Sequence, residues 1–492
     1  MTNEELVGQR SADEGTTGLL LESEPRSEIR SVAVYGHSHI TPSPRHARYF
    51  ETVEGRTYIP IGLNLCFPRH VVKREEGLNK MFRWLDRLSE NGGNFARIFM
   101  GHAFFDIESG DFGTFDEEKA SRLDAVLEYA WQRGVRLKLT IDLFRTVEEA
   151  EQAEIFPGAV SFSKPNFHTS NNGRFEDMDD YLLSREGRAH FLRKLDWLAE
   201  RYGDHPGIFG WDLWNEMNAV SSVHWQSWTR EMLVELKKRF PRHLAMQTLG
   251  SMDGDDSVRN YETIMPLASN EASQAHRYLD AGARYAICHG PVDVMMADAV
   301  GILLRVAPGK PAILAEGGAV ERQHIGPWLL YPSDTEGIVL HDVLFAPFFA
   351  GAAGCGQAWH WQEYVDPNHL WAHYARFAKA IEGVDPIEQR LTPECWEAND
   401  LRVYALVGRT QCLVWCRETH SDWRTELVDH IPAGVVKGAK VTLPSRLGSN
   451  WQGRFYDPWT NRQSEPQAIV DGCVNIPDFR RSMVLRLERV EE

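Results

Sequence analysis

Positive charge is scarce in this sequence of 492 residues. Its 53 lysine and arginine residues are outnumbered by 70 aspartate and glutamate residues, and the formal net charge is −17. Such a chain repels phosphate backbones and anionic lipid headgroups. We therefore expect neither nucleic acid nor a membrane among its partners.

Paired cysteines are also lacking. The seven cysteines are scattered, odd in number and include no C-x-x-C pair, a pattern typical of reduced thiols in the cytosol. Residues 1–28 are acidic and contain no basic start followed by an apolar core, so they do not look like a secretory signal. Both observations favour a cytoplasmic protein.

The best candidate for a membrane span, Val343–Trp361, is a poor one. This uncharged stretch contains Pro347, several glycines and the polar residues Gln357 and His360, which do not suit a lipid-facing helix. We predict instead a buried helix that leads into a strand.

Several common catalytic motifs are absent. The sequence contains no HExxH motif, no Walker loop, no G-x-S-x-G and no G-x-G-x-x-G after its first strand. His37 and His39 would share one face of a strand, but no second cluster with metal-ligand spacing follows them. We therefore expect neither a metal nor a cofactor.

Strand-like and helix-like segments alternate from about Tyr58 to residue 382. Eight short apolar segments are each followed by a helical stretch, which predicts parallel βαβ units. Eight units favour an α/β fold of the (β/α)8 TIM barrel type over an open doubly wound sheet. We place the eighth strand at residues 352–359.

Helical periodicity disappears after about Gly383. The short alternating runs that follow predict a small C-terminal antiparallel β-sandwich. We therefore divide the chain into a partly flexible N-terminal extension over residues 1–45, a (β/α)8 barrel over 46–385 and a β-sandwich over 386–492.

Two predicted strands end in glutamate. Glu216 follows the fourth strand and Glu316 follows the seventh, about 100 residues later. In a closed barrel these strand ends face each other across the mouth, where active sites are built. Two opposed carboxylates there could flank a glycosidic bond, one as nucleophile and one as acid/base.

These residues resemble those of the retaining glycoside hydrolases of clan A, especially glycoside hydrolase family 5. The resemblance covers the barrel, and similar sandwiches follow the barrel in several relatives. It implies that Arg97 braces the nucleophile, that Asn215 binds the sugar 2-hydroxyl, and that Tyr278 of the H-x-Y motif beginning at His276 contacts the nucleophile.

The resemblance also implies a tryptophan platform under the sugar at the end of strand eight. Trp361 is our preferred candidate and Trp359 the alternative. The sequence departs from many family members at strand three, where Asp142 stands near the place of a histidine, and Asp142 is a candidate for substrate binding instead. His102, just after strand two, is a further candidate for contact with a sugar hydroxyl.

The expected activity is that of a retaining β-glycosidase acting by double displacement, with Glu316 as nucleophile and Glu216 as acid/base. We expect burial and the charge of Glu316 to raise the pKa of Glu216. The favoured substrates are small β-mannosides, β-glucosides or β-galactosides cleaved in exo mode. An endo-acting β-mannanase or β-glucanase and a non-catalytic carbohydrate-binding barrel are the alternatives, and the oligomeric state is open.

Overall fold

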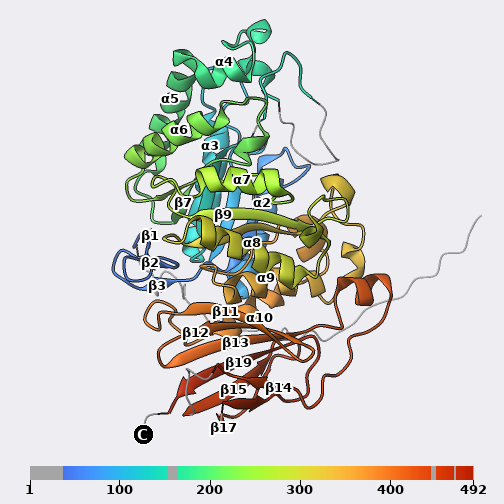
Figure 1. The fold of residues 1–492 in the computed structure, drawn as a ribbon. Coiled ribbons are helices and arrows are strands. Elements are labelled where there is room, and N and C mark those ends of the chain that lie inside the picture. The colour runs from blue at the N-terminus through green and yellow to red at the C-terminus, as the bar shows by residue number, and fades with distance from the viewer. Residues whose placement is uncertain (1–36, 144, 153–162, 445–449, 470–471, 491–492) are drawn as a thin grey trace, which may run out of the picture.

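Parallel strands form the centre of the larger part of the molecule (Figure 1). The computed structural model describes residues 37–143, 145–152, 163–444, 450–469 and 472–490. Five parallel strands pair in chain order: β4 (Gly62–Asn64), β5 (Phe95–Phe99), β6 (Arg136–Asp142), β7 (Ile208–Trp214) and β8 (Leu244–Met246). Every residue of these strands is buried, as expected for parallel strands that are covered on both faces.

A second parallel sheet continues the same order. It consists of β9 (Ser273–Leu279) and β10 (Ala312–Ala319). The backbone of Glu271, just before β9, donates a hydrogen bond to the Ala245 carbonyl of β8 at 2.9 Å. Seven parallel strands therefore follow one another in the order that the (β/α)8 prediction requires.

Residues 352–359, where we predicted the eighth strand, do not form a continuous strand, although a parallel bridge pairs Ala358 with Gly317 of β10. This segment lies between the first and last parallel strands: Asn64 donates to the Ala358 carbonyl at 3.1 Å, and Gly317 donates to the Gln357 carbonyl at 2.9 Å. At Gly356 the Val343 carbonyl approaches so closely that a Cβ would lie 2.1 Å from its oxygen. The glycines here permit close backbone packing in place of an extended strand.

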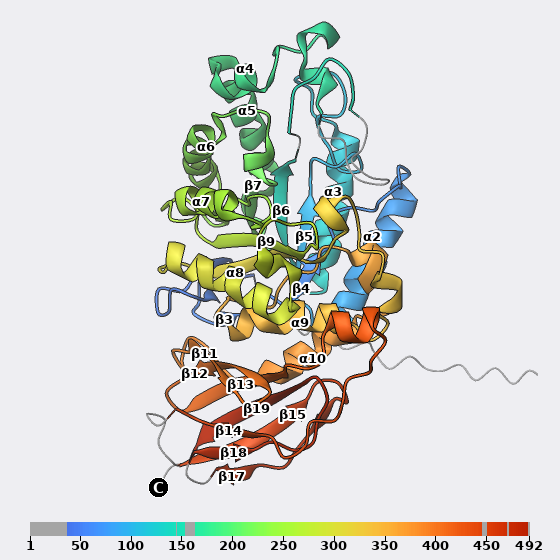
Figure 2. The same ribbon diagram turned by 45° about the vertical axis from the view of Figure 1, so that its right-hand side comes forward.

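Helices connect the strands and cover them (Figure 2). They are α2 (Arg74–Glu90), α3 (Glu117–Gln132), α4 (Met178–Leu183), α5 (Arg185–Tyr202), α6 (Trp225–Arg239), α7 (Asp255–Ile264), α8 (Val292–Val306), α9 (Ile338–Phe349) and α10 (Ala372–Ile381). Side chains cap two of the long ones, since Asp116 accepts from backbone N–H groups at the start of α3 and Ser184 does so at the start of α5.

Helix α9 contains the first part of the long uncharged stretch Val343–Trp361. All of its residues are buried, because it contacts α8 and β10 on one side and the C-terminal strands on the other. The prediction of a buried helix there is confirmed. In the part of the chain that the structure describes, no helix combines the length and the apolar character needed to cross a bilayer.

A small antiparallel sheet precedes the parallel strands. It contains β1 (Ile40–Pro42), β2 (Phe50–Thr52) and β3 (Thr57–Tyr58). The last residues of the predicted extension thus pair with β2. Residues 1–36 of that extension lie outside the described residues.

The C-terminal part is antiparallel, as predicted (Figure 1). One sheet contains β11 (Thr392–Ala398), β12 (Leu401–Val407), β13 (Gln411–Glu418), β15 (Trp451–Asp457), β16 (Arg462–Gln463), β17 (Gln467–Ile469) and β19 (Ser482–Arg489). A second sheet pairs β14 (Lys440–Thr442) with β18 (Cys473–Asn475). Apolar side chains of both sheets share one core, which is how two stacked sheets bury their inner faces.

Buried ion pairs join the C-terminal sheet to the helices above it. Asp293 of α8 is fully buried and accepts from Arg402 Nε at 2.6 Å and from the Tyr404 hydroxyl at 2.9 Å. Asp342 of α9 accepts from Arg417 Nε at 3.0 Å. These charges are compensated only while the two parts are packed together.

Candidate active site

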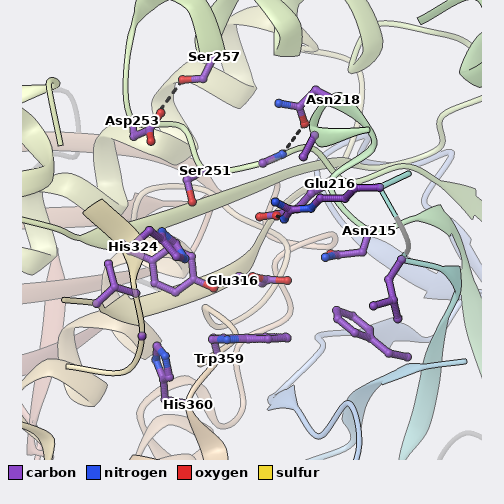
Figure 3. A pocket seen from close by; sticks show the side chains of 18 of the residues that line it. Asn215, Glu216, Asn218, Ser251, Asp253, Ser257, Glu316, His324, Trp359 and His360 are labelled. Atoms are coloured by element: carbon purple, nitrogen blue, oxygen red, sulfur yellow. Dashed lines mark hydrogen bonds and ion pairs between the residues drawn. The ribbon is translucent and has the colours of Figure 1, made fainter. Parts of the chain in front are cut away.

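A cavity of about 470 Å³ lies at the carboxyl ends of the parallel strands (Figure 3). Both glutamates singled out in the sequence line it, together with residues at the ends of other strands, among them Phe99, Leu143, Asn215 and Tyr278. Proteins built on parallel strands place their reacting groups at this end. The structure therefore brings Glu216 and Glu316 into one pocket.

Glu316 is almost fully buried, and both of its carboxylate oxygens have donors. Arg97 Nη1 donates to Oε1 at 2.6 Å, and the Tyr278 hydroxyl donates to Oε2 at 2.5 Å. Burial and the charge of Glu316 raise the pKa of Tyr278 well above its usual value, so the phenol keeps the proton that it donates. The Glu316 carboxylate is thus held in one orientation.

A β-bulge directs Glu316 into the cavity. In the pairing of β10 with β9, Leu314 lies opposite Ala275 and Glu316 lies opposite His276, so Ala315 is an extra residue. Such an insertion changes the direction in which the following side chain points, and bulges occur frequently next to active sites.

Arg97 connects Glu316 to the neighbouring strands. Its Nη2 donates to Asp212 Oδ2 at 2.6 Å and to Asn215 Oδ1 at 2.9 Å. Burial lowers the pKa of Arg97, but the charges of Asp212 and Glu316 outweigh burial and the net shift is upward. The guanidinium therefore remains charged between two buried carboxylates.

Asn215 presents its amide NH2 group to the cavity. Because the Oδ1 atom accepts from Arg97, the orientation of the amide is determined by that hydrogen bond. The nitrogen of Asn215 points into the pocket in Figure 3. A sugar hydroxyl in the cavity would find a donor there.

Glu216 occupies a strained backbone position. Its φ of 52° and ψ of 52° lie in the left-handed region, which costs an ordinary residue about 1–3 kcal/mol and is concentrated at functional sites. Immediately after β7 this turn directs the Glu216 side chain into the cavity, where it is 14% exposed.

Two cationic or donor groups contact the Glu216 carboxylate. His276 Nδ1 lies 3.0 Å from Oε1, and Arg145 Nη2 lies 2.5 Å from Oε2. Burial raises the pKa of Glu216, but the hydrogen bond from His276 and the charge of Arg145 outweigh burial, and the net shift is downward. The expectation of a raised pKa is wrong for this arrangement, because His276 donates a hydrogen bond to the carboxylate and Arg145, which the sequence did not reveal as a partner, adds its charge.

His276 lies between the two glutamates. Its Nδ1 is also 3.4 Å from Glu316 Oε2. Ligand atoms of Glu216, His276 and Glu316 lie within 4.8 Å of one another, and no other three-residue group able to hold a metal was found in the described ranges. Arg97 and Arg145 already neutralise the two carboxylates, an environment that does not favour a cation.

The structure favours Trp359 over Trp361 as the platform. Trp359 lines the cavity, and Figure 3 shows its ring nearly edge-on beneath Glu316. Trp361 is 1% exposed, does not line the cavity and packs against Phe67 and Trp84. The preference for Trp361 is corrected, because the chain turns into a helical segment at that residue.

Asp142 and His102 also lie outside the cavity lining. Asp142 is buried and pairs with Lys194 Nζ at 3.1 Å. The His102 ring stacks on Phe67 with centroids 4.0 Å apart, and burial lowers its pKa to about 3. Both residues support the walls of the site, so the expectation that they contact substrate is corrected.

Several lining residues were not singled out in the sequence. Arg145, three positions after Asp142, is the most consequential, and Asn218, Gln323, His324 and His360 accompany it. Arg145 lies shortly after the end of β6, which could have marked it. The others lie on loops whose paths a sequence pattern does not reveal.

The comparisons with known proteins agree with this geometry. The family model described as cellulase, glycosyl hydrolase family 5, matches residues 71–323. A solved structure described as a glycoside hydrolase is similar, with a TM-score of 0.55 and 12% identity over 93% of this chain and 98% of that chain. A family 5 glycoside hydrolase from Bacteroides vulgatus ATCC 8482 has a TM-score of 0.55 and 12% identity over 92% and 94% of the two chains. No curated protein sequence matches this chain.

The two glutamates in one cavity at the strand ends, together with this family match, define a glycoside hydrolase. The chain belongs to glycoside hydrolase family 5, which is part of clan A. The match covers just over half of the chain. The resemblance inferred from the strand ends is confirmed, and the protein is an enzyme that hydrolyses glycosidic bonds.

Proposed function

We propose that the chain is a retaining β-glycosidase built on a closed (β/α)8 barrel over residues 46–385, which the β-sandwich of residues 386–492 stabilises. One observation carries the retaining mechanism: carboxylate oxygens of Glu216 and Glu316 lie within 4.8 Å of each other. Retaining enzymes need carboxyl groups about 5–5.5 Å apart, whereas inverting enzymes separate them by about 6.5–9.5 Å to admit a water molecule.

In the first step Glu316 attacks the anomeric carbon, and the bond from that carbon to the leaving oxygen breaks. Arg97 and Tyr278 hold the attacking carboxylate in position. Glu216 gives its proton to the leaving oxygen, so the departing group leaves as a neutral alcohol. A covalent glycosyl-enzyme results.

In the second step Glu216 acts as base. It removes a proton from water while the water oxygen attacks the anomeric carbon and the bond to Glu316 breaks. The product keeps the β configuration. The NH2 group of Asn215 stabilises charge that develops near the sugar 2-hydroxyl, which lowers the transition-state energy more than the energy of the bound substrate.

The cavity supports exo action on small β-mannosides, β-glucosides or β-galactosides, since about 470 Å³ is in the size range of small-molecule sites. One observation favours the endo alternative. A second cavity of about 630 Å³ shares Asp253, Ser257, Gln323 and His324 with the first, and together the two could admit a longer sugar chain.

The test is a panel of aryl β-glycosides of mannose, glucose, galactose, xylose and fucose, followed by NMR of the first-formed sugar. We expect turnover of at least one of the first three with β product. An α product would exclude the retaining mechanism. Absence of turnover on the whole panel, with cleavage of β-mannan or β-glucan oligosaccharides, would establish the endo alternative.

A further inference from the structure

Arg145 is a charged residue of the cavity that contacts Glu216 but has no part in the double-displacement mechanism. It lies after β6, and its side chain is 27% exposed while its guanidinium contacts Glu216 Oε2 at 2.5 Å. Its backbone carbonyl accepts from the Ser221 N–H at 2.6 Å and from the Ser221 hydroxyl at 3.0 Å. The backbone is therefore anchored, and the long side chain can change partners without a movement of the loop.

The contact with Glu216 opposes the role proposed for that residue. A proton donor must hold its proton until the leaving oxygen takes it, but a guanidinium in contact favours the ionised carboxylate. The other titratable groups that interact with Glu216 are His276 and Tyr278 from β9, Glu316 from β10, His324 from the loop after β10 and Tyr261 from α7. Among them only Glu316 favours a protonated Glu216, and Arg97 already compensates its charge.

Arg145 would leave Glu216 if a better anion lay nearby. The guanidinium binds carboxylates with a pair of parallel hydrogen bonds. Because Glu216 lies beside the leaving oxygen, a carboxylate on the leaving part of the substrate would come within reach of Arg145. Arg69 lines the same cavity, but its guanidinium pairs with Glu363, whereas the guanidinium of Arg145 contacts Glu216, the residue beside the leaving oxygen. Arg145 is therefore the arginine that we expect to bind this group.

We propose that Arg145 binds a carboxylate on the leaving group of the substrate, and that this exchange of partners frees Glu216 to take up a proton from solvent. The inference rests on the proposed β-glycosidase activity and narrows its substrate class to β-glycosides with an acidic leaving group. Arg145 is thus both a specificity residue and a positioning residue for the proton donor.

The experiment compares two substrates that differ in one charge, a 3-carboxyphenyl and a 3-carbamoylphenyl β-glycoside of the sugar that the panel selects. We expect wild-type kcat/KM to favour the carboxylate by about tenfold or more, which corresponds to about 1.4 kcal/mol. Arg145→Gln should bring the ratio close to one, and Arg145→Lys should retain part of it. Arg69→Gln, which removes the same charge from the same cavity, is the matched control and should keep the wild-type ratio.

A second readout distinguishes this role from a merely structural one. On the neutral substrate, the basic limb of the kcat/KM profile should move to higher pH in Arg145→Gln, because the cation that lowers the pKa of Glu216 is gone. Equal rates on both substrates in wild type, or equal loss of the ratio in the Arg69 variant, would overturn this inference alone. Failure of wild type to hydrolyse any β-glycoside would overturn the proposed function and this inference with it.

Discussion

Arg97 of β5 and Glu316 of β10 are 219 residues apart in the chain, yet Arg97 Nη1 and Glu316 Oε1 lie 2.6 Å from each other. The arginine side chain is fully buried, and that of the glutamate is 4% exposed. A buried ion pair costs desolvation energy on both sides, which is recovered only with good geometry and further hydrogen bonds. Asp212, Thr140 and Asn215 supply those bonds to Arg97.

Replacement of Arg97 should therefore affect stability and activity together. Arg97→Met leaves Asp212 and Glu316 buried without their counter-charge, and we expect the free energy of unfolding to fall by about 3–5 kcal/mol. Urea unfolding followed by tryptophan fluorescence measures this loss. Arg242→Met, at an exposed pair with Asp204, is the control and should unfold like wild type. If the Arg97 variant also unfolded like wild type, the pair of Arg97 and Glu316 would contribute nothing to stability.

The roles of the two glutamates can be separated by azide rescue. In Glu316→Ala, azide should attack from the α face where the carboxylate stood, and give the α-glycosyl azide. In Glu216→Ala, the glycosyl-enzyme still forms with a good leaving group, and azide should attack it from the β face to give the β-glycosyl azide. Product NMR distinguishes the two anomers, and the opposite pattern would exchange the assigned roles.

Loss of Trp359 should affect substrate binding, whereas loss of Trp361 should affect stability. Trp359→Ala removes an apolar face from the cavity, and we expect KM to rise by about tenfold to 100-fold, since burying such a side chain contributes about 1.5–3 kcal/mol. Trp361→Ala opens a void in the core and should lower the free energy of unfolding by about 3–5 kcal/mol. Steady-state kinetics and urea unfolding of both variants check this. A larger rise in KM for Trp361→Ala than for Trp359→Ala would favour Trp361 as the platform under the sugar.

The C-terminal sheet should unfold together with the parallel strands. Arg417→Met leaves Asp342 of α9 buried and unpaired, and we expect a loss of about 3–5 kcal/mol in the free energy of unfolding. The double variant Asp342→Leu/Arg417→Met removes both charges and should be more stable than the single variant. Calorimetry of each should give one cooperative transition; two separate transitions in wild type would mean that the sheet is an independent unit.

Much of the fold follows from sequence patterns. Apolar strands alternating with amphipathic helices predicted the parallel strands, and the period-two runs after Gly383 predicted the antiparallel sheet. These patterns are reliable because each helix or strand must bury its apolar face wherever it packs, and the spacing of apolar residues reflects that face. The prediction for residues 352–359 was less exact, because this glycine-rich segment is hydrogen-bonded to β4 and β10 without forming a continuous strand.

The sequence by itself determined the family, the parallel strands and the two glutamates at the ends of the fourth and seventh strands, because strand ends in such a fold converge on one face. Only the tertiary structure decided which side chains touch those glutamates. The bulge at Ala315, the left-handed turn at Glu216 and the position of Arg145 beside it depend on contacts between distant segments. Local periodicity carries no information about such contacts, and they decide the charge, the orientation and the reach of the reacting groups.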